Sequence, residues 1–410
     1  LYTILIKLLQ FLLPLGRFFG KKPALFVDGR KHLFKNLEQR IEQDSNYIWI
    51  HTASLGEFEQ AVPVIEQLRQ EFPHYKILVS FFSPSGYENK KTHRLVDVIT
   101  YIPLDTPTNA SKFLDLVQPK LAIFVKYEVW PNFLAELKNR KIHSILISAL
   151  FRKDQIYFKP SGKWMHEALA GFNHIFVQNQ ASENLLNSFG FENVSVSGDT
   201  RFDRVHRQLA YDNRLDFMEA FLDKKLCFVA GSTWPEDEEL LQDFLEELPQ
   251  NLKVVIAPHE IKQEKLQELE AKLPQKIIRH SQIKGKALFE YKILIIDNIG
   301  MLGRLYAYAD FAYVGGAAGK TGLHNILEPA VFGIPVLSGM NTEKFPEAGL
   351  LEQEGGLFRL ENPEHAKNKL TALATDEGLR KEVGTKSANF IQEHIGATAK
   401  IIGYLKTQFS

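Results

Sequence analysis

A glycine-rich stretch between two apolar segments has the residue types of a nucleotide-binding loop. An apolar run ends at Tyr313-Val314, residues 315–322 follow with four glycines, and a helix is predicted to begin near Asn325. Glycines let backbone N–H groups approach an anion closely, and a helix N-terminus adds its dipole. Glu328, about one turn into that helix, is placed to accept hydrogen bonds from ribose hydroxyls. Taken alone, the segment also fits an ordinary strand–loop–helix connection with a capping Asn and a surface Glu.

Two further carboxylates follow apolar runs in the first half of the chain. Glu57 comes after the run at residues 47–52, in the first turn of the next predicted helix, and Glu128 comes after residues 121–125. Ligands of parallel sheets bind beyond the carboxyl ends of the strands, so both carboxylates are candidates for a functional site. Glu in a first helical turn also occurs because it complements the helix dipole, so both interpretations of Glu57 stay open.

The second half of the chain has more candidates for an anion site, each directly after an apolar run. They are Gly231-Ser232-Thr233, Pro258-His259 and Ile299-Gly300-Met301. None is specific alone, and a lone histidine is more often a structural hydrogen bonder than a ligand. Their shared position after predicted strands, together with the glycine-rich loop, indicates one nucleotide site. The absence of a Walker loop, of an early Gly-x-Gly-x-x-Gly and of metal-ligand spacing weighs against a kinase, a dehydrogenase and a metal-dependent transferase.

Short apolar runs alternate with helical patterns and predict the elements that position these residues. The predicted strands lie at residues 47–52, 76–80, 98–102, 121–125, 144–147, 174–177 and 194–197, and then at 226–230, 253–257, 293–297, 311–314 and 335–337. A polar segment without strand character, residues 204–225, separates the two series. Two βαβ series in succession predict two doubly wound α/β domains that face a cleft, with ligands bound beyond the carboxyl ends of the strands.

Length and composition agree with this division. A chain of 410 residues is too long for one ordinary core. The 49 basic and 49 acidic residues balance, which argues against a nucleic-acid binder. The single cysteine, Cys227, lies in an apolar run and cannot form an intrachain disulfide, so a reducing compartment is permitted.

The N-terminal segment combines apolar and basic residues. Residues 1–40 carry eight Lys or Arg and two Asp or Glu, a net charge of +6, behind an apolar run over residues 1–13. That run is interrupted by Lys7 and Pro14, and no signal-peptide cleavage site follows it. An apolar helix followed by basic residues fits a monotopic anchor on anionic lipids. A buried N-terminal helix and, since the chain begins with Leu, a longer membrane span stay open as alternatives.

Several motifs in chain order resemble the Kdo transferases, the 3-deoxy-D-manno-octulosonic acid transferases of lipopolysaccharide assembly. They are Gly56-Glu57, Glu128-Val129-Trp130-Pro131-Asn132, Gly198-Asp199-Thr200-Arg201-Phe202-Asp203, Gly231-Ser232-Thr233, and Gly315-Gly316 with His324-Asn325-Ile326-Leu327-Glu328-Pro329. The resemblance implies a GT-B fold of two Rossmann-like domains and metal-independent, inverting transfer of Kdo from CMP-Kdo to a lipid A precursor of the lipid IVA type. It implies no cofactor and a place on the cytoplasmic face of the inner membrane.

The same resemblance assigns roles to individual residues. It implies that Glu57 is the general base and that Glu128 and Arg201 assist the transition state. The residues implied in binding the CMP donor are Ser232, Thr233, Pro258, His259, Ile299, Gly300, Met301, Gly315, Gly316, His324, Asn325, Ile326, Leu327 and Glu328. The chain departs from the family pattern at Glu260, where an Arg-containing Pro-Arg-His is usual, at Met301 in place of Glu, at Arg201 in place of Lys, and at Trp234 in place of His.

We therefore expect a membrane anchor helix over residues 1–22, an acceptor-binding domain over 23–205 and a CMP-sugar-binding domain over 206–390. A C-terminal helix over 391–410 is expected to pack back on the first domain. Two other functions stay open: another GT-B nucleotide-sugar enzyme, such as a UDP-sugar transferase or an epimerase, and a non-catalytic, membrane-associated nucleotide-sugar binder.

Overall fold

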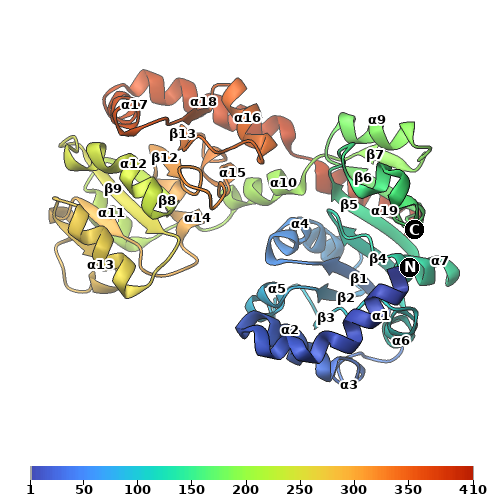
Figure 1. Ribbon diagram of the computed structural model, residues 1–410. Helices are drawn as coiled ribbons and strands as arrows, with labels where there is room; N and C mark the ends of the chain where they lie inside the picture. The colour runs from blue at the N-terminus through green and yellow to red at the C-terminus, as the bar shows by residue number, and fades with distance from the viewer. Residues whose placement is uncertain (1, 410) are drawn as a thin grey trace. The chain divides into compact units, whose positions relative to one another are not determined.

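The computed structural model describes residues 2–409 and divides the chain into two compact units. The first unit comprises Leu1–Arg204 with Ile395–Ser410, and the second comprises Val205–His394 (Figure 1). The last segment of the chain thus belongs to the same unit as the first.

The first unit is built on a seven-stranded parallel sheet with the order β3-β2-β1-β4-β5-β6-β7. Its strands are β1 (Tyr47–Thr52), β2 (Lys76–Phe81), β3 (Val98–Tyr101), β4 (Pro119–Val125), β5 (His143–Ala149), β6 (His174–Val177) and β7 (Val194–Val196). Its helices are α1 (Tyr2–Leu12), η1 (Leu13–Phe19), α2 (Lys21–Lys31), α3 (Leu33–Glu38), α4 (Leu55–Glu71), α5 (Pro84–Asn89), α6 (Pro107–Val117), α7 (Pro131–Asn139), η2 (Ile156–Phe158), η3 (Pro160–Gly162), α8 (Lys163–Leu169), α9 (Gln180–Ser188), α10 (Thr200–His206) and α19 (Ala397–Phe409).

The second unit repeats this plan with the strand order β10-β11-β9-β8-β12-β13-β14, again all parallel. Its strands are β8 (Leu226–Thr233), β9 (Leu252–Pro258), β10 (Ile277–Arg279), β11 (Ile293–Ile295), β12 (Phe311–Val314), β13 (Val336–Ser338) and β14 (Leu357–Arg359). Its helices are η4 (Arg207–Ala210), α11 (Asp216–Leu222), α12 (Pro235–Glu246), α13 (Gln263–Lys272), η5 (His280–Gln282), η6 (Leu288–Glu290), α14 (Leu302–Leu305), η7 (Tyr306–Tyr308), α15 (Leu327–Ala330), α16 (Pro346–Gln353), α17 (Pro363–Thr375) and α18 (Glu377–His394).

The central strands are largely apolar, as expected for strands whose two faces are both covered by helices. In β1 every residue is buried, and Trp49 packs into one core cluster while Ile48 and Ile50 pack into another. Successive side chains of a strand point to opposite faces, so a strand covered on both faces reads as a continuous apolar run. The predicted doubly wound α/β class is confirmed.

Some predicted boundaries were wrong. Strand β8 continues through Thr233 rather than ending at Ala230, β11 ends at Ile295 rather than Asp297, and the edge strands β10 and β14 were not predicted. Edge strands of three residues give too short a pattern to recognise. The helix predicted to begin near Asn325 begins at Leu327, has four residues, and contains Glu328 as its second residue rather than one turn in.

The C-terminal helix α19 is fastened to the first unit by a carboxylate. Asp203 accepts hydrogen bonds at 2.7 Å from the amides of Gly396 and Thr398 and from the Thr398 hydroxyl. Farther along α19, the Tyr404 hydroxyl lies 3.1 Å from His143 Nε2, and Ile401 and Leu405 are buried in the same cluster as α4. The Asp203 carboxylate therefore caps the helix that covers this face of the first sheet.

We predict that Asp203→Ala releases the start of α19. The change removes a carboxylate that holds three donors, and hydrogen bonds to charged groups contribute about 1.5–3 kcal/mol each. The melting temperature should fall, and hydrogen exchange should accelerate at the α19 amides before it does in β1 or β4. Glu377→Ala, an exposed change at the start of α18, is the matched control. Unchanged exchange in α19 would contradict this role for Asp203.

Candidate active site

Glu57 lies at the carboxyl end of β1, in the first turn of α4. Ser54 is the N-cap of α4, and its hydroxyl accepts from the Glu57 amide at 3.5 Å. The Glu57 carboxylate in turn accepts from the amides of Ser54, at 3.3 Å, and Ala53. This is a capping box, so the helix-start interpretation of Glu57 describes its local structure correctly. The box also holds the carboxylate in one place.

The surroundings of Glu57 make it basic enough to accept a proton near neutral pH. Burial and the negative charge of Glu128 raise the pKa of Glu57 to about 7, although the two amides and Lys126 act in the opposite direction. A general base is most effective when its pKa lies near the working pH. The capping role is therefore compatible with the general-base role that the family resemblance implies.

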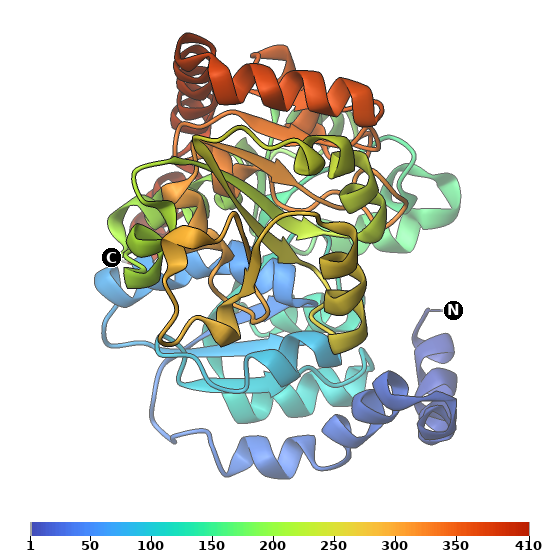
Figure 2. The same cartoon turned by 90° about the vertical axis from the view of Figure 1, so that its left-hand side faces the viewer.

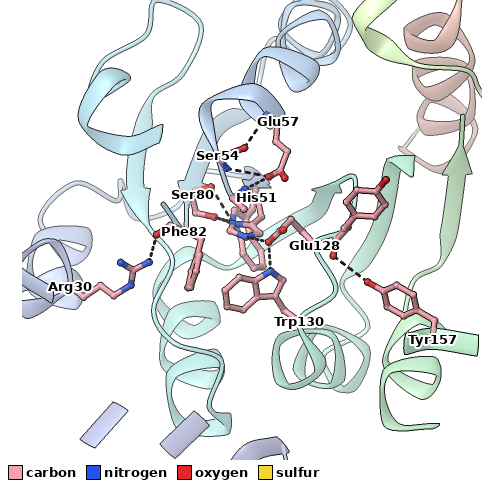
Figure 3. Close-up of polar contacts among 12 residues, drawn as sticks. Arg30, His51, Ser54, Glu57, Ser80, Phe82, Glu128, Trp130 and Tyr157 are labelled. Atoms are coloured by element: carbon pink, nitrogen blue, oxygen red, sulfur yellow. Dashed lines mark hydrogen bonds and ion pairs between the residues drawn. The ribbon is translucent and has the colours of Figure 1, made fainter. Parts of the chain in front are cut away.

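Glu128 lies beyond the carboxyl end of β4, the strand next to β1, and two ring N–H groups fix its carboxylate. The Trp130 indole donates to Glu128 Oε2 at 2.8 Å, and His51 Nε2 lies 3.2 Å from the same oxygen. Figure 3 shows this cluster beneath the Glu57 carboxylate. Trp130 packs edge-on against both His51 and Phe82, so the rings that hold Glu128 are themselves held by packing.

A chain of hydrogen bonds sets the orientation of His51, which is fully buried in β1. The Trp49 indole donates to the Ser80 hydroxyl oxygen at 2.8 Å, and His51 Nδ1 lies 2.9 Å from that oxygen and 3.2 Å from the Ser80 carbonyl oxygen. Two contacts to one residue of the neighbouring strand fix the ring plane and direct Nε2 toward Glu128.

Arg201 follows β7, at the start of α10, and Asp199 holds its guanidinium. Arg201 Nε and Nη2 each lie 2.8 Å from Asp199 Oδ2, and the Arg201 amide donates to Asp199 Oδ1 at 2.9 Å. Three helical residues later, Arg204 pairs with Glu59 of α4 at 3.0 Å. Helix α10 is thereby tied to the helix that carries Glu57. The Arg201 guanidinium therefore forms an ion pair with Asp199.

In the second unit, every predicted binding residue lies at or beyond the carboxyl end of one of four neighbouring strands. Ser232 and Thr233 end β8, Pro258 and His259 end β9, residues 299–301 follow β11, and residues 315–328 follow β12. The sheet order places β11, β9, β8 and β12 side by side. The structure therefore brings these residues to one edge of the sheet, where ligands of doubly wound domains bind.

A buried aspartate, Asp237, shapes the glycine-rich loop from inside. Its carboxylate accepts from the amides of Gly316 at 2.7 Å and Ala318 at 3.2 Å, and from the Tyr313 hydroxyl at 2.6 Å. The Gly315 amide donates to Gly231. A Cβ at Gly315 would lie 2.3 Å from the Ser232 carbonyl oxygen, so only glycine fits this close approach. The amides of Gly315 and Gly316 both donate within the protein, so an anion at this loop has to meet other donors.

Three aromatic rings meet beside this loop. Trp234 stacks on His259 with ring centroids 4.4 Å apart, His259 lies 4.7 Å from His324, and Trp234 Nε1 lies 3.4 Å from His324 Nε2. Burial and neighbouring His259 lower the pKa of His324, so it is neutral at neutral pH. Trp234, the departure from the family pattern, is therefore the residue that joins the ends of β8 and β9 to the loop after β12.

The remaining predicted binding residues differ in what they present. Asn325 donates to Glu328 Oε1 at 3.2 Å. Burial and the negative charge of Glu328 raise the pKa of the Tyr306 hydroxyl, which lies beside Gly231 of β8. The Thr233 hydroxyl donates to Glu238 at 3.2 Å rather than facing outward. The side chains of Ile326 and Leu327 are buried, so only their backbone can meet a ligand.

Other predicted binding residues have an unusual backbone conformation or are strongly exposed. Ser232 has a left-handed φ of 55° at an irregular point of β8, where pairing shifts register. Such conformations cluster at functional sites. Ile299 is 84% exposed and Gly300 has a φ of 95°, which glycine adopts readily.

Three residues with clear roles at these sites carried no prediction. They are His51, Lys126 and Asp237. His51 is a polar residue inside an apolar strand, which is a visible signal, but its partners Ser80 and Glu128 are 29 and 77 residues away. Asp237 looks like an ordinary acidic residue in a first helical turn, and only the folded chain shows the loop that it holds. Among residues 2–409 no group of His, Cys, Asp and Glu has the arrangement of a metal site.

Comparison with solved structures identifies the type of fold. The solved UDP-GlcNAc 2-epimerase from Neisseria meningitidis, bound to UDP-GlcNAc, superposes with a TM-score of 0.63 at 15% identity. The likeness covers 88% of this chain and 100% of that chain. At this identity it supports the fold alone. The fold is of the GT-B type.

Sequence relatives specify the activity. A family model described as 3-deoxy-D-manno-octulosonic-acid transferase (kdotransferase) matches residues 29–204. The 3-deoxy-D-manno-octulosonic acid transferase of Chlamydophila psittaci is 30% identical over 71% of this chain and 69% of its own length. That of Haemophilus influenzae is 28% identical over 88% of this chain and 86% of its own length.

The fold and these relatives define the protein as a glycosyltransferase. More particularly, the chain belongs to the Kdo transferase family.

The pKa of Glu57 predicts how activity depends on pH. A general base must be deprotonated, so kcat/KM should fall as the pH drops through about 7. Glu128→Gln removes a negative charge that raises this pKa, so the acidic limb of its residual activity should move to lower pH. Glu136→Gln, on α7 and paired with Arg140, is the matched control. An acidic limb that stays in place in Glu128→Gln would show that the two carboxylates are not coupled.

Proposed function

We propose that this enzyme transfers Kdo from CMP-Kdo to a lipid A precursor of the lipid IVA type, with inversion and without a metal ion. Membership of the Kdo transferase family supports the donor and the acceptor. The observation that carries the mechanism is the coupled pair of carboxylates, in which Glu57 titrates near neutral pH beside the charge of Glu128. Environments that push the pKa values of two carboxylates apart give them different roles.

Glu57 is the proposed general base. A sugar hydroxyl is a poor nucleophile, and Glu57 takes its proton as the oxygen attacks the anomeric carbon of Kdo. The new C–O bond forms opposite the bond to the CMP phosphate, which breaks, and CMP leaves with the bonding electrons. One displacement of this kind inverts the anomeric centre.

Glu128 and Arg201 are the proposed supporting groups. Positive charge grows at the anomeric carbon of glycosyl donors as the leaving group departs, and an oriented carboxylate such as Glu128 stabilises it. Arg201 meets the negative charge on the donor phosphate or on the Kdo carboxylate, with Asp199 fixing the plane of its fork. A phosphate leaving group needs this electrostatic support more than it needs an acid.

CMP is proposed to bind at the carboxyl edge of the second sheet. The backbone of Pro258 and His259, residues 299–301 and residues 324–328 surround this site, and Glu328 accepts from the ribose hydroxyls. The faces of His259 and His324 suit the flat cytosine ring. Because Asp237 takes the Gly316 and Ala318 amides, its role is to fix the loop that the nucleotide contacts.

The N-terminal segment is proposed to hold the enzyme on the cytoplasmic face of the inner membrane. The helical stretch Tyr2–Phe19 is apolar enough to enter a membrane, and none of it is buried. Its first turn is docked on the unit, because the Tyr2 hydroxyl donates to Asp105 at 2.9 Å and its ring stacks on Trp164. An anchored helix that lies along the protein suits an acceptor that stays in the membrane.

The direct test is to incubate the protein with CMP-Kdo and a tetraacyl lipid A precursor. Release of CMP with a matching mass gain on the lipid is expected, in EDTA as well as without it. Glu57→Gln should lose about 10²–10⁴-fold in kcat while CMP binding stays nearly intact. Gln also completes a capping box, so this variant should keep its melting temperature. Turnover near the wild-type value in Glu57→Gln would remove Glu57 as the base.

We predict that Glu328→Ala weakens CMP binding measured by calorimetry. Hydrogen bonds to a charged group contribute about 1.5–3 kcal/mol, so Kd should rise on the order of tenfold or more. Glu364→Ala, an exposed change at the start of α17, should bind CMP like the wild type. Equal affinities in the two variants would count against the ribose contact.

A further inference from the structure

A cavity of about 320 Å³ lies between the N-terminal helices and the segment that leads from β3 into α6 in the first unit. Its rim includes the exposed residues Pro14 and Arg17 of η1 and Lys31 of α2, and its floor includes the buried Leu33 and Leu104. The volume falls in the range of small-ligand sites. Neither the proposed base nor the proposed nucleotide site lies in its walls.

The cavity combines apolar walls with positive charge. Arg17, Arg30 and Lys31 line it, against one carboxylate, Asp28, which pairs with Arg17 at 3.1 Å. Apolar walls with an excess of cations are complementary to a molecule that has an apolar body and an anionic group.

Arg30 contributes a partly buried positive charge to the cavity walls. Its guanidinium donates to the carbonyl oxygens of Ile102, Phe26 and Phe82 at 3.0, 3.1 and 2.7 Å. Since a guanidinium has five N–H groups, two are left without an acceptor among residues 2–409. All three acceptors are neutral, and no carboxylate in that range pairs with Arg30. The rings of Phe26 and Tyr101 lie 3.7 and 4.7 Å from the Arg30 guanidinium carbon and partly offset its charge. Burial disfavours the charged form and lowers the pKa of Arg30 to about 9.

The cavity adjoins the surface proposed to enter the membrane. Helix α1 leads directly into η1, and along these two elements Phe11, Phe18 and Phe19 are 81%, 85% and 79% exposed. Figure 2 shows these dark-blue N-terminal helices at one edge of the first unit. A lipid in the layer that receives these side chains would lie beside the rim of the cavity.

We propose that this cavity binds one anionic phospholipid of the membrane, with an acyl chain on the Leu33 and Leu104 floor and the phosphate between Arg30 and Lys31. The site would fix the depth and rotation of the enzyme on the membrane, because a bound lipid clamps η1 to α2. The inference rests on the proposed membrane attachment of α1, and it adds a defined stoichiometric site to a general attraction for anionic lipid.

The test uses the full chain and vesicles of phosphatidylcholine doped with photoreactive phosphatidylglycerol, whose acyl chain carries a diazirine. Illumination followed by peptide mass spectrometry should place the label on residues 13–17 and 27–34. The same vesicles doped with photoreactive phosphatidylcholine should label the exposed face of α1 but label the cavity several-fold less.

Matched variants separate the cavity from the surface. Lys31→Glu and Val27→Phe, which reverse a rim charge and fill the cavity, should each reduce cavity labelling several-fold. Lys35→Glu reverses a neighbouring charge and Leu25→Phe introduces the same aromatic side chain, both outside the cavity walls, and both should leave labelling unchanged. Equal effects of Lys31→Glu and Lys35→Glu, or equal labelling by the two lipids, would overturn the proposal in favour of non-specific charge attraction.

Cosedimentation with the vesicles distinguishes the membrane anchor from the lipid site. Protein that sediments without cavity labelling keeps the membrane anchor and overturns the lipid site. Protein that does not sediment overturns both. Circular dichroism of each variant shows whether a loss of labelling comes from unfolding, and Arg30→Lys, which keeps the charge but loses the fork, should retain partial labelling.

Discussion

The candidate active site depends on two carboxylates that share a half-buried space. Burial disfavours the ionised form of Glu57, and the negative charge of nearby Glu128 disfavours it further, so the pKa of Glu57 rises to about 7. This coupling works only if both groups stay in place. The capping box of α4 fixes one, and the rings of His51 and Trp130 fix the other. Much of the local structure of the first unit serves this condition.

The contacts that hold the two carboxylates also belong to the ordinary secondary structure of the fold. Ser54 and Glu57 begin α4, and the same hydrogen bonds hold the proposed base. His51 and Trp49 are on one strand, and Ser80 on the neighbouring strand links their rings. Because these side chains belong to the buried sheet, their positions are set by packing rather than by a flexible loop. Preorganisation of this kind is what allows charges to act in a transition state without a reorganisation cost.

In the second unit, too, a buried side chain fixes the candidate site, here Asp237. Asp237 is fully buried, and its charge is compensated by the loop amides and the Tyr313 hydroxyl that it accepts from. The loop after β12 therefore takes its shape from inside the protein. The rings of Trp234, His259 and His324 then join three strand ends into one surface. A chain that lacks the family's usual Arg at Glu260 and His at Trp234 still forms a defined edge here.

The sequence by itself determined the fold class and the family, and it predicted a site at the ends of the strands. Parallel strands buried on both faces are continuous apolar runs, and such runs are legible without any knowledge of their neighbours. The motifs around Glu57, Glu128 and Glu328 are also local, so their residues could be named from their order in the chain alone.

Only the tertiary structure decided which groups meet. His51 gains its role from partners 29 and 77 residues away, Asp237 from a loop about 80 residues away, and Arg30 from carbonyls on three separate segments. The amides of Gly315 and Gly316 were assigned to a ligand because their sequence is typical of such loops, whereas the folded chain supplies its own acceptors. Long-range contacts of this kind leave no periodic pattern, since burial and charge depend on neighbours that the linear order does not specify.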